Sequence, residues 1–270
     1  METNQANKGV ALITGASSGI GAVYADRLAR RGYDLIIVAR DLARLQALAE
    51  RLDEQTGRRV EFIGADLTTL EGMRRIGQVL ETDARITLLV NNAGVGATQS
   101  LIDSDANRLC KLIQLNVVAL TRLTHAAAPA FVARGRGTII NVASIVALAP
   151  ELLNGVYAAS KSFVLTFTQS LHHELAARGI QVQAVLPGAT GTDFWKTAGT
   201  PVSNLPAQIV MSAEDMVDAA LVGLDRKELV TIPSLPDAAD WERFDAARKL
   251  MGPLLSRSMP AERYLIDPSR

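Results

Sequence analysis

Short runs of apolar residues recur along the chain, and each run is too short for a typical helix. Continuous apolar runs of this length are typical of strands that are buried on both faces of a sheet. The pattern therefore predicts six buried strands and a shorter seventh. They cover residues 10–13, 35–38, 60–63, 86–90, 138–142, 182–186 and 229–232.

Between these runs lie segments rich in Ala, Leu and Arg with helical spacing, such as residues 42–52. Thr68 with Glu71, and Ser212 with Asp215, place a hydroxyl three residues before an acid, as in a capping box at the start of a helix. Glycines stand where helices should end, because only glycine adopts a left-handed C-cap without strain. These glycines are Gly32, Gly57, Gly135 and Gly179.

Regular alternation of strands and helices predicts right-handed βαβ units, and hence a parallel sheet with helices on both faces. No linker, repeat or change of composition divides the chain, so we expect a single domain over residues 1–270.

The pattern loosens after Gly188. Residues 190–211 are rich in Thr, Pro, Gly and Ser yet contain Phe194 and Trp195, which is typical of a substrate lid, the alternative being a permanently packed segment. Two helices (213–226 and 237–255) and a polar tail (256–270) follow.

Composition narrows the class of protein. Hydrophobic residues make up 48% and charged residues 21%, which is an ordinary balance for a globular protein. The 28 Lys and Arg balance the 28 Asp and Glu, so no basic excess favours binding to nucleic acid. Cys110 is the single cysteine, and no apolar run reaches the ~18 residues that span a bilayer. We therefore expect a cytoplasmic protein that binds neither nucleic acid nor membrane.

A glycine-rich turn, residues 14–21 with the sequence TGASSGIG, follows the first predicted strand and opens the first helix. Glycine lets the backbone approach a pyrophosphate closely, and a helix N-terminus offers unpaired N–H groups to the anion. A glycine turn without a ligand is the plainer reading, but its place between a strand and a helix favours a dinucleotide. The spacing does not match the P-loop of nucleoside triphosphatases.

The turn after the second strand bears on the choice of cofactor. An acid normally holds the ribose 2′-hydroxyl there, but Ala39 has no acceptor and Arg40 can clamp a 2′-phosphate. Asp41 is an alternative acceptor or merely a helix N-cap. The sequence favours NADP(H), with NAD(H) as the alternative.

Tyr157 and Lys161 lie four residues apart, and therefore on one side of a predicted helix whose apolar stripe we expect at Phe163, Phe167, Leu171 and Leu175. An ammonium near a phenol lowers the pKa of the phenol, as a proton-exchanging tyrosine requires. Ser144 follows the fifth strand, at the carboxyl edge of the sheet where open α/β folds bind ligands.

At this point the chain resembles the short-chain dehydrogenase/reductase family in its shorter form. The match is specific because many short motifs occur in the family's order and at its separations. They are 14–21, Asp66-Leu67, 91–94 (NNAG), Asn116, Ser144, Tyr157 with Lys161, Pro187-Gly188 and Thr192. The resemblance implies a Rossmann-type doubly wound sheet with strand order 3-2-1-4-5-6-7.

The resemblance also implies roles for individual residues. Tyr157 would be the general acid/base, Ser144 would bind the substrate oxygen, Lys161 would hold the nicotinamide ribose, and Asn116 would position a proton-relaying water. Asp66 would accept the adenine amino group, and Thr192 would bind the carboxamide. Ser18 departs from NADP-using relatives that carry Arg or Lys there. The full set of expected cofactor-binding residues is Gly15, Ser17, Ser18, Gly19, Ile20, Gly21, Arg40, Asp66, Leu67, Asn92, Ala93, Gly94, Tyr157, Lys161, Pro187, Gly188 and Thr192.

Other reactive side chains carry no motif. His172 and His173 lack the HExxH spacing of a zinc site, so we expect no metal and place them with His125 on helix surfaces. Cys110 has no thiolate-stabilising neighbour, and we expect it to be packed.

These patterns together predict an NADP(H)-dependent oxidoreductase that interconverts a carbonyl and a secondary alcohol on a small hydrophobic substrate. We expect a homodimer or homotetramer. One alternative is a 3-oxoacyl-carrier-protein reductase, although residues 145–156 contain no basic residue to receive an acidic carrier. The alternative from another class is a nucleotide-sensing protein without catalysis, which commonly loses the tyrosine or lysine that this chain keeps.

Overall fold

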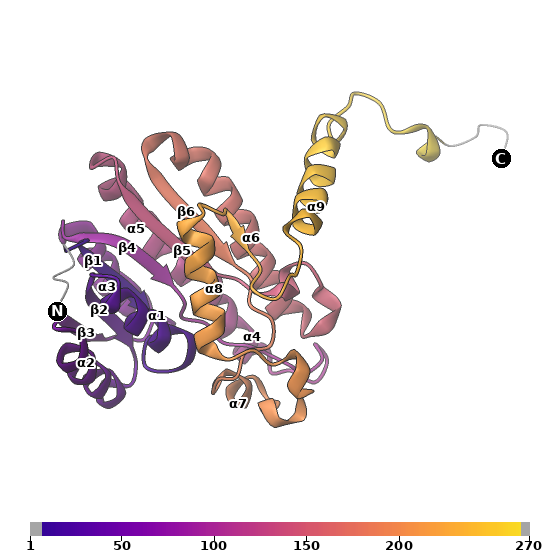
Figure 1. Ribbon diagram of the computed structural model, residues 1–270. Helices are drawn as coiled ribbons and strands as arrows, with labels where there is room; N and C mark the ends of the chain where they lie inside the picture. Colours follow the sequence, from indigo (N-terminus) through magenta and orange to yellow (C-terminus); the bar gives the residue numbers. More distant parts are fainter. Residues whose placement is uncertain (1–6, 266–270) are drawn as a thin grey trace. The chain divides into compact units, whose positions relative to one another are not determined.

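The computed structural model describes residues 7–265 and contains a seven-stranded parallel sheet (Figure 1). The strand order is β3-β2-β1-β4-β5-β6-β7, which confirms the predicted topology. The order reverses between β1 and β4, so a crevice at the carboxyl edge opens there. The strands are β1 (Val10–Thr14), β2 (Asp34–Ala39), β3 (Val60–Gly64), β4 (Ile86–Asn91), β5 (Gly137–Val142), β6 (Ile180–Val185) and β7 (Val230–Thr231).

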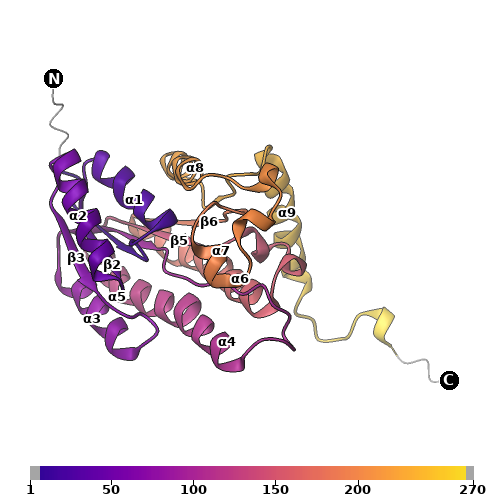
Figure 2. The same ribbon diagram turned by 90° about the horizontal axis from the view of Figure 1, so that it is seen from below.

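Helices cover both faces of the sheet (Figure 2). Successive residues of a strand point to opposite faces, so each apolar strand supplies two hydrophobic cores. Ala11 and Ile13 of β1 pack in one core, and Val10 and Leu12 pack in the other. The first core includes helices α1 (Gly19–Arg30), α2 (Leu42–Thr56) and α8 (Ala213–Asp225); the second includes α3 (Leu70–Thr82), α5 (Leu120–Ala133) and α6 (Gly155–Leu175).

Helix ends follow the predicted chemistry with one shift. Ser212 caps α8, where its hydroxyl accepts from the Asp215 N–H at 2.9 Å. The cap of α3 is Thr69 rather than the expected Thr68, because the Thr68 hydroxyl donates to the Asp66 carboxylate instead. The four glycines expected at helix ends all have positive φ, between 63° and 97°.

A continuous helical stretch, Ala106–Ala133, joins α4 (Ala106–Ile113) and α5 through a π-helical turn, Gln114–Ala119. Its mean hydropathy of 1.2 over one window makes it long and apolar enough to cross a membrane by length and composition alone. A core helix passes the same test, and Leu123, Ala127 and Phe131 of this stretch line the second hydrophobic core. The π turn has a second consequence, because it sets the backbone around Asn116.

The segment of residues 190–211 is folded. It contains a short helix, α7 (Phe194–Ala198), followed by two 3₁₀ turns, and Thr190 and Met211 at its ends form a parallel bridge. Trp195 is buried, and its indole N–H donates to the Thr190 carbonyl oxygen at 2.9 Å. The lid function expected of this segment stays a prediction.

The described chain divides into two compact units, residues 7–233 and 234–265. The second unit holds α9 (Ala238–Met251) and short 3₁₀ turns, and none of its described residues is buried. Its side chains form ion pairs within α9, for example Arg248 with Asp245 at 2.7 Å. A segment without buried residues has no core of its own, and the single domain expected over residues 1–270 stays a prediction. Residues 266–270 of the expected tail lie outside the described residues.

Candidate active site

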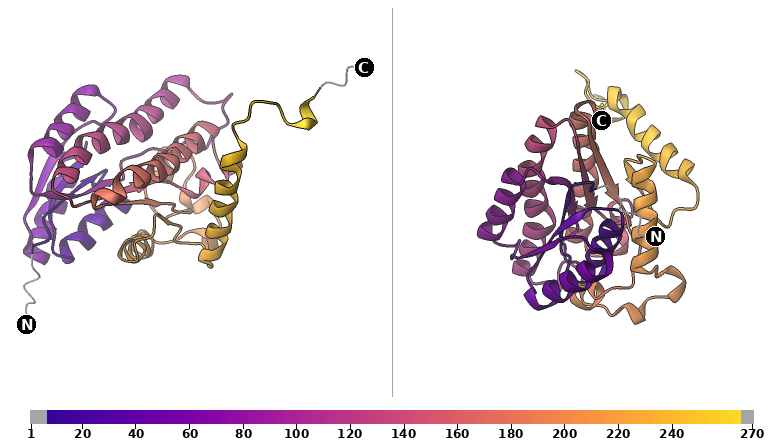
Figure 3. Two further views of the ribbon diagram at one scale, coloured as in Figure 1. Left: turned by 90° about the horizontal axis from the view of Figure 1, so that it is seen from above. Right: turned by 60° about the vertical axis from the view of Figure 1, so that its left-hand side comes forward.

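Several of the predicted site residues lie in loops that follow four strands at the carboxyl edge of the sheet. Two further views of the sheet and its covering helices are given in Figure 3. The glycine turn follows β1, residues 92–94 follow β4, Ser144 follows β5, and Pro187 with Gly188 follows β6. Parallel strands end at the same edge, so the topology gathers these segments into one crevice. The sheet thus brings these loops together, and helix α6 adds Tyr157 and Lys161.

The glycine turn packs against the loop after β4. The Thr14 hydroxyl accepts from the backbone N–H of Asn92 at 3.1 Å and of Ala93 at 3.0 Å. The Asn92 amide donates back to the carbonyls of Thr14 and Gly15. A Cβ at Gly21 would lie 2.3 Å from the Gly15 carbonyl oxygen, so only glycine fits there. The backbone of the turn is therefore held in one shape.

The rest of the turn faces the opposite wall of the crevice. Ser18 caps α1 with extended backbone and makes no side-chain cap bond, so the first N–H groups of α1 are available to an anion. Gly19, with φ of 53°, packs against Thr192, since a Cβ there would touch the Thr192 methyl at 3.0 Å. Ser17 is half-buried, and Ile20 packs against the first core.

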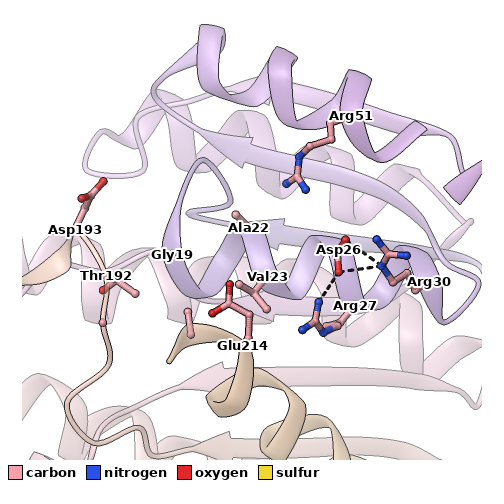
Figure 4. Close-up of a pocket in the computed structure, with 12 residues that line it drawn as sticks. Gly19, Ala22, Val23, Asp26, Arg27, Arg30, Arg51, Thr192, Asp193 and Glu214 are labelled. Atoms are coloured by element: carbon pink, nitrogen blue, oxygen red, sulfur yellow. Dashed lines mark hydrogen bonds and ion pairs between the residues drawn. The ribbon is translucent and has the colours of Figure 1, made fainter. Parts of the chain in front are cut away.

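A surface cleft of about 510 Å³ runs beside this helix start, between α1 and residues 191–193 (Figure 4). Gly19 and Thr192 line it, but Tyr157 and Lys161 do not. The charges in the cleft are mixed, and Arg27 and Arg30 are both bonded to Asp26. This cleft therefore runs along α1 and does not reach the tyrosine.

Arg40 and Asp66 stand at the far end of the crevice, after β2 and β3. Arg40 is exposed and makes no hydrogen bond or ion pair with any residue that the structure describes. Asp41 is the N-cap of α2 and accepts from the Arg44 N–H at 3.0 Å, so its carboxylate is already engaged. Of the two residues weighed for the ribose, Arg40 is the available one.

Asp66 is held in place by its neighbour. Its carboxylate accepts from the backbone N–H of Thr68 at 2.9 Å and from the Thr68 hydroxyl at 2.8 Å. Partial burial works to raise its pKa, but these hydrogen bonds and the positive charges of Arg40 and Lys111 outweigh burial, so the pKa of Asp66 is lowered. Leu67 beside it is buried in the second core. An ionised acceptor therefore stands near Arg40.

Tyr157 and Ser144 are buried together. Tyr157 lies in the first turn of α6, which Asn154 caps by accepting from the N–H groups of Val156 and Tyr157. Ser144 caps a 3₁₀ turn, and its hydroxyl lies 3.4 Å from the Pro187 carbonyl oxygen. Burial raises the pKa of Tyr157 to about 12, and a hydrogen bond with Ser144 acts in the opposite direction. The pKa of Tyr157 is thus raised rather than lowered as expected, because the cost of burying the phenolate outweighs the stabilisation that its neighbours provide.

Lys161 is buried one helical turn beyond Tyr157. Its Nζ donates to the Val142 carbonyl oxygen at 2.9 Å and lies 5.9 Å from the centroid of the Tyr157 ring. Burial lowers the pKa of Lys161 to about 8. A Cβ at Gly94 would lie 3.5 Å from this Nζ, so the loop after β4 reaches the lysine.

Asn116 lies in the π-helical turn and is fully engaged. Its side-chain oxygen accepts from the Val95 N–H at 3.0 Å, and its amide donates to the Val95 carbonyl and to the Ser160 hydroxyl. The side chain therefore ties the loop after β4 to α6. The water-positioning role expected of Asn116 stays a prediction.

Two details of the sequence interpretation are wrong. The apolar stripe expected on α6 is confirmed for Phe167, Leu171 and Leu175, which pack in or against the second core, but Phe163 is exposed. The buried face of α6 also includes Tyr157 and Lys161, because the β5–β6 half of the sheet covers it. Cys110 is exposed rather than packed, because Leu109 and Leu112 form the inward stripe of α4. The three histidines lie on helix surfaces, and no metal-binding cluster occurs among residues 7–265.

Three residues outside the expected catalytic and cofactor-binding sets complete the site. The Phe194 ring lies 5.9 Å from the Tyr157 ring, centroid to centroid, and packs over Gly96. Thr14 and Ser160 bond to Asn92 and Asn116. Thr14 had a signal, since it precedes the first glycine of the turn. Phe194 had none beyond its apolar character in a polar segment.

The chain belongs to the short chain dehydrogenase family, whose pattern matches residues 9–202. It is an oxidoreductase of that family, acting on CH–OH groups with a nicotinamide dinucleotide as acceptor.

Three individual proteins that are similar to this chain carry more specific names. A short-chain dehydrogenase from Sphingobium yanoikuyae, solved in complex with NADPH, is 49% identical, with a TM-score of 0.93 over 95% of this chain and all of that chain. A bulky-bulky ketone specific alcohol dehydrogenase from Comamonas testosteroni is 45% identical, with a TM-score of 0.89 over 96% of this chain and all of that chain. Human 17-beta-hydroxysteroid dehydrogenase type 3 is 33% identical over 78% of this chain, which spans about two thirds (66%) of the human enzyme.

Proposed function

We propose that this enzyme interconverts a ketone and a secondary alcohol with NADP(H), with Tyr157 as the general acid/base. The observation that carries the proposal is the buried cluster at the carboxyl end of β5. There, Tyr157 shares a hydrogen bond with Ser144, and the ammonium of Lys161 lies one helical turn away. A phenol, a hydroxyl and an ammonium in this arrangement can hold a carbonyl oxygen and protonate it.

The crevice fits a dinucleotide. Gly15 and Gly21 let the turn pack tightly on itself and on the loop after β4, because a Cβ at either would clash with these segments. The start of α1 offers free N–H groups to a pyrophosphate. Arg40 is unpartnered among the described residues and can clamp a 2′-phosphate, which supports NADP(H) over NAD(H). The NADPH complex of the Sphingobium relative supports the same choice. Asp66, Leu67 and residues 92–94 would surround the adenosine, and Pro187, Gly188 and Thr192 the nicotinamide end.

The cofactor, when bound, supplies the hydride. The chain supplies the rest. Ser144 would orient the carbonyl oxygen, and Tyr157 would donate its proton to that oxygen. A pKa of about 12 keeps the Tyr157 hydroxyl protonated at neutral pH, which suits the reductive direction. Lys161, with a pKa of about 8, is mostly charged at neutral pH and stabilises the phenolate that forms.

The substrate class follows from the lining of the site. Val146, Leu153, Val156 and Phe194 form an apolar cluster around Tyr157, which favours a hydrophobic ketone. We propose ketones with a bulky group on each side of the carbonyl, as the name of the Comamonas relative also suggests. The absence of Lys and Arg from residues 145–156 disfavours an acyl chain on an acidic carrier.

We further propose a cytoplasmic homodimer or homotetramer, in keeping with the exposed apolar residues of α9, such as Phe244 and Leu250.

A panel of ketones and alcohols, followed at the nicotinamide absorbance band with both cofactors, tests the proposal. We expect turnover of aryl alkyl ketones with NADPH, and weaker turnover with NADH. A 3-oxoacyl thioester belongs in the same panel. Turnover of the thioester alone would contradict the substrate class, and no turnover of any carbonyl would contradict the function.

A further inference from the structure

Gly96 is a glycine that its own backbone does not require. It lies two residues beyond Gly94, and its φ is outside the left-handed region that favours glycine. A Cβ at this position would lie 2.3 Å from Cζ of Phe194 and 3.0 Å from each of its Cε atoms. The space that the missing side chain leaves is therefore taken by the Phe194 ring, which comes from a segment about a hundred residues later in the chain.

The same ring contacts the proposed acid/base. The rings of Phe194 and Tyr157 lie 5.9 Å apart, tilted by 46°, within the usual range for an aromatic pair. Phe194 packs against the buried apolar cluster that contains Tyr157 and Ala97. One aromatic ring thus contacts both Gly96 and the phenol that a substrate must reach.

Contacts at both ends of the short helix α7 fix the ring. Thr98 donates its backbone N–H and its hydroxyl to the Ala198 carbonyl, at 3.2 and 3.1 Å. Next to Phe194, the buried Trp195 stacks edge-to-face on it at 5.7 Å. The position of the ring is therefore set by the fold and is not a chance rotamer of an exposed side chain.

We propose that Gly96 and Phe194 form a specificity-determining pair, in which the ring seated on Gly96 is the wall that limits one substituent of the substrate. The proposal rests on the proposed function, because the substituent in question is attached to the carbonyl that Tyr157 protonates. A carbonyl bonded to Tyr157 and Ser144 must place one of its two groups beside this ring. Gly96 acts only through Phe194 and touches no substrate.

A double-mutant cycle tests the pair. The measured quantity is the ratio of kcat/KM for phenyl propyl ketone to kcat/KM for phenyl methyl ketone, with NADPH. Phe194→Ala should raise this ratio by about tenfold or more, since each methylene in an apolar pocket is worth at least that. Gly96→Ala should change the ratio by displacing the ring. In the Phe194→Ala background, the same Gly96→Ala change should leave the ratio within about twofold, because no ring remains to displace.

Equal effects of Gly96→Ala in both backgrounds would overturn the coupling, and an unchanged ratio in Phe194→Ala would overturn the wall. Phe62→Ala is the matched control, since Phe62 is half-exposed on β3 at the far edge of the sheet. Phe194→Val is measured in parallel in case the alanine variant does not fold.

Two readouts separate this proposal from the proposed function. Absence of wild-type turnover with either ketone, while NADPH binds, would contradict the proposed function. A crystal structure of Gly96→Ala needs no activity: the ring should leave its wild-type position, and a ring found in place would overturn the pairing of Gly96 with Phe194.

Discussion

The glycine turn (residues 14–21) and the segment of residues 190–211 border the same crevice but are held by different forces. Backbone atoms shape the glycine turn. Only glycine fits at position 21, because the Gly15 carbonyl lies where a Cβ would be, and the side chains of Asn92 and Thr14 bond to backbone groups. Side chains shape the second, through the packing of Phe194 and Trp195. The glycine turn, which we call the cradle, is therefore fixed by backbone, whereas the facing segment of residues 190–211 can be altered by side-chain substitutions. A constant cofactor requires the first property, and a variable substrate requires the second.

The largest effect should come from adding one methyl group to the cradle. In Gly21→Ala the new Cβ would lie 2.3 Å from the Gly15 carbonyl oxygen and 2.5 Å from Nδ2 of Asn92, and backbone cannot turn away as a side chain can. We expect a loss of about 3 kcal/mol in the free energy of unfolding, together with weaker NADPH binding, measured by denaturant unfolding and titration.

Gly191→Ala is the matched control in the other region. Its Cβ would meet Val210 at 3.7 Å and Met211 at 3.8 Å, which is ordinary contact. We expect a change within about 0.5 kcal/mol. Equal losses of unfolding free energy in the two variants would contradict the distinction between the glycine turn and the segment of residues 190–211.

The next effect separates two arginines. Arg40→Ala should weaken NADPH binding by about 1.5–3 kcal/mol and leave NADH nearly unchanged, because a 2′-phosphate makes charge-assisted hydrogen bonds. Arg44, which lies 3.5 Å from Asp41 and from Asp193 of the other region, is the control; Arg44→Ala should not discriminate between the cofactors. Equal weakening of both cofactors by Arg40→Ala would make Arg40 structural.

Buried charge at the site predicts a pH dependence that neither region shares. The pKa of Lys161 is about 8 in the folded protein and near 10.5 when exposed, so between these values the unfolded chain binds more protons. Stability therefore rises with pH in this window, by up to about 1.4 kcal/mol per pH unit. The unfolding free energy of wild type minus that of Lys161→Met should therefore become more positive from pH 8 to 10. The contribution of Tyr157, which is present in both proteins, cancels. A constant difference would show that burial does not depress this pKa.

The smallest effect concerns the helix behind the cradle. Tyr24 of α1 is fully buried, and its hydroxyl has no hydrogen-bond partner among the described residues. Burial also raises its pKa well above the ordinary value. Tyr24→Phe should stabilise the fold by about 1 kcal/mol, since it removes a buried polar group that is not paired. Thermal unfolding measures this, and a destabilised variant would indicate a hydrogen bond to bound water.

The comparison also explains what the sequence could predict. The alternation of strands and helices and the helix ends at glycine depend on local pattern and backbone conformation, and the structure confirms them. The structure also confirms the strand order, which the family resemblance implied. The buried face of α6, the exposure of Cys110 and the shift from Thr68 to Thr69 depend on what packs alongside, which periodicity does not reveal. The contact of Phe194 with Gly96 joins two segments about a hundred residues apart, and no local sequence pattern predicts it.

The central claim is that Tyr157 donates the proton to the carbonyl oxygen. Single-turnover reduction of phenyl propyl ketone by NADPH-loaded Tyr157→Phe tests it most directly, because the phenylalanine keeps the ring that packs against Phe194 and removes only the hydroxyl. We predict a rate at least about 10³-fold below wild type with NADPH affinity unchanged. A variant that binds NADPH normally and reduces the ketone within about tenfold of the wild-type rate would contradict the claim.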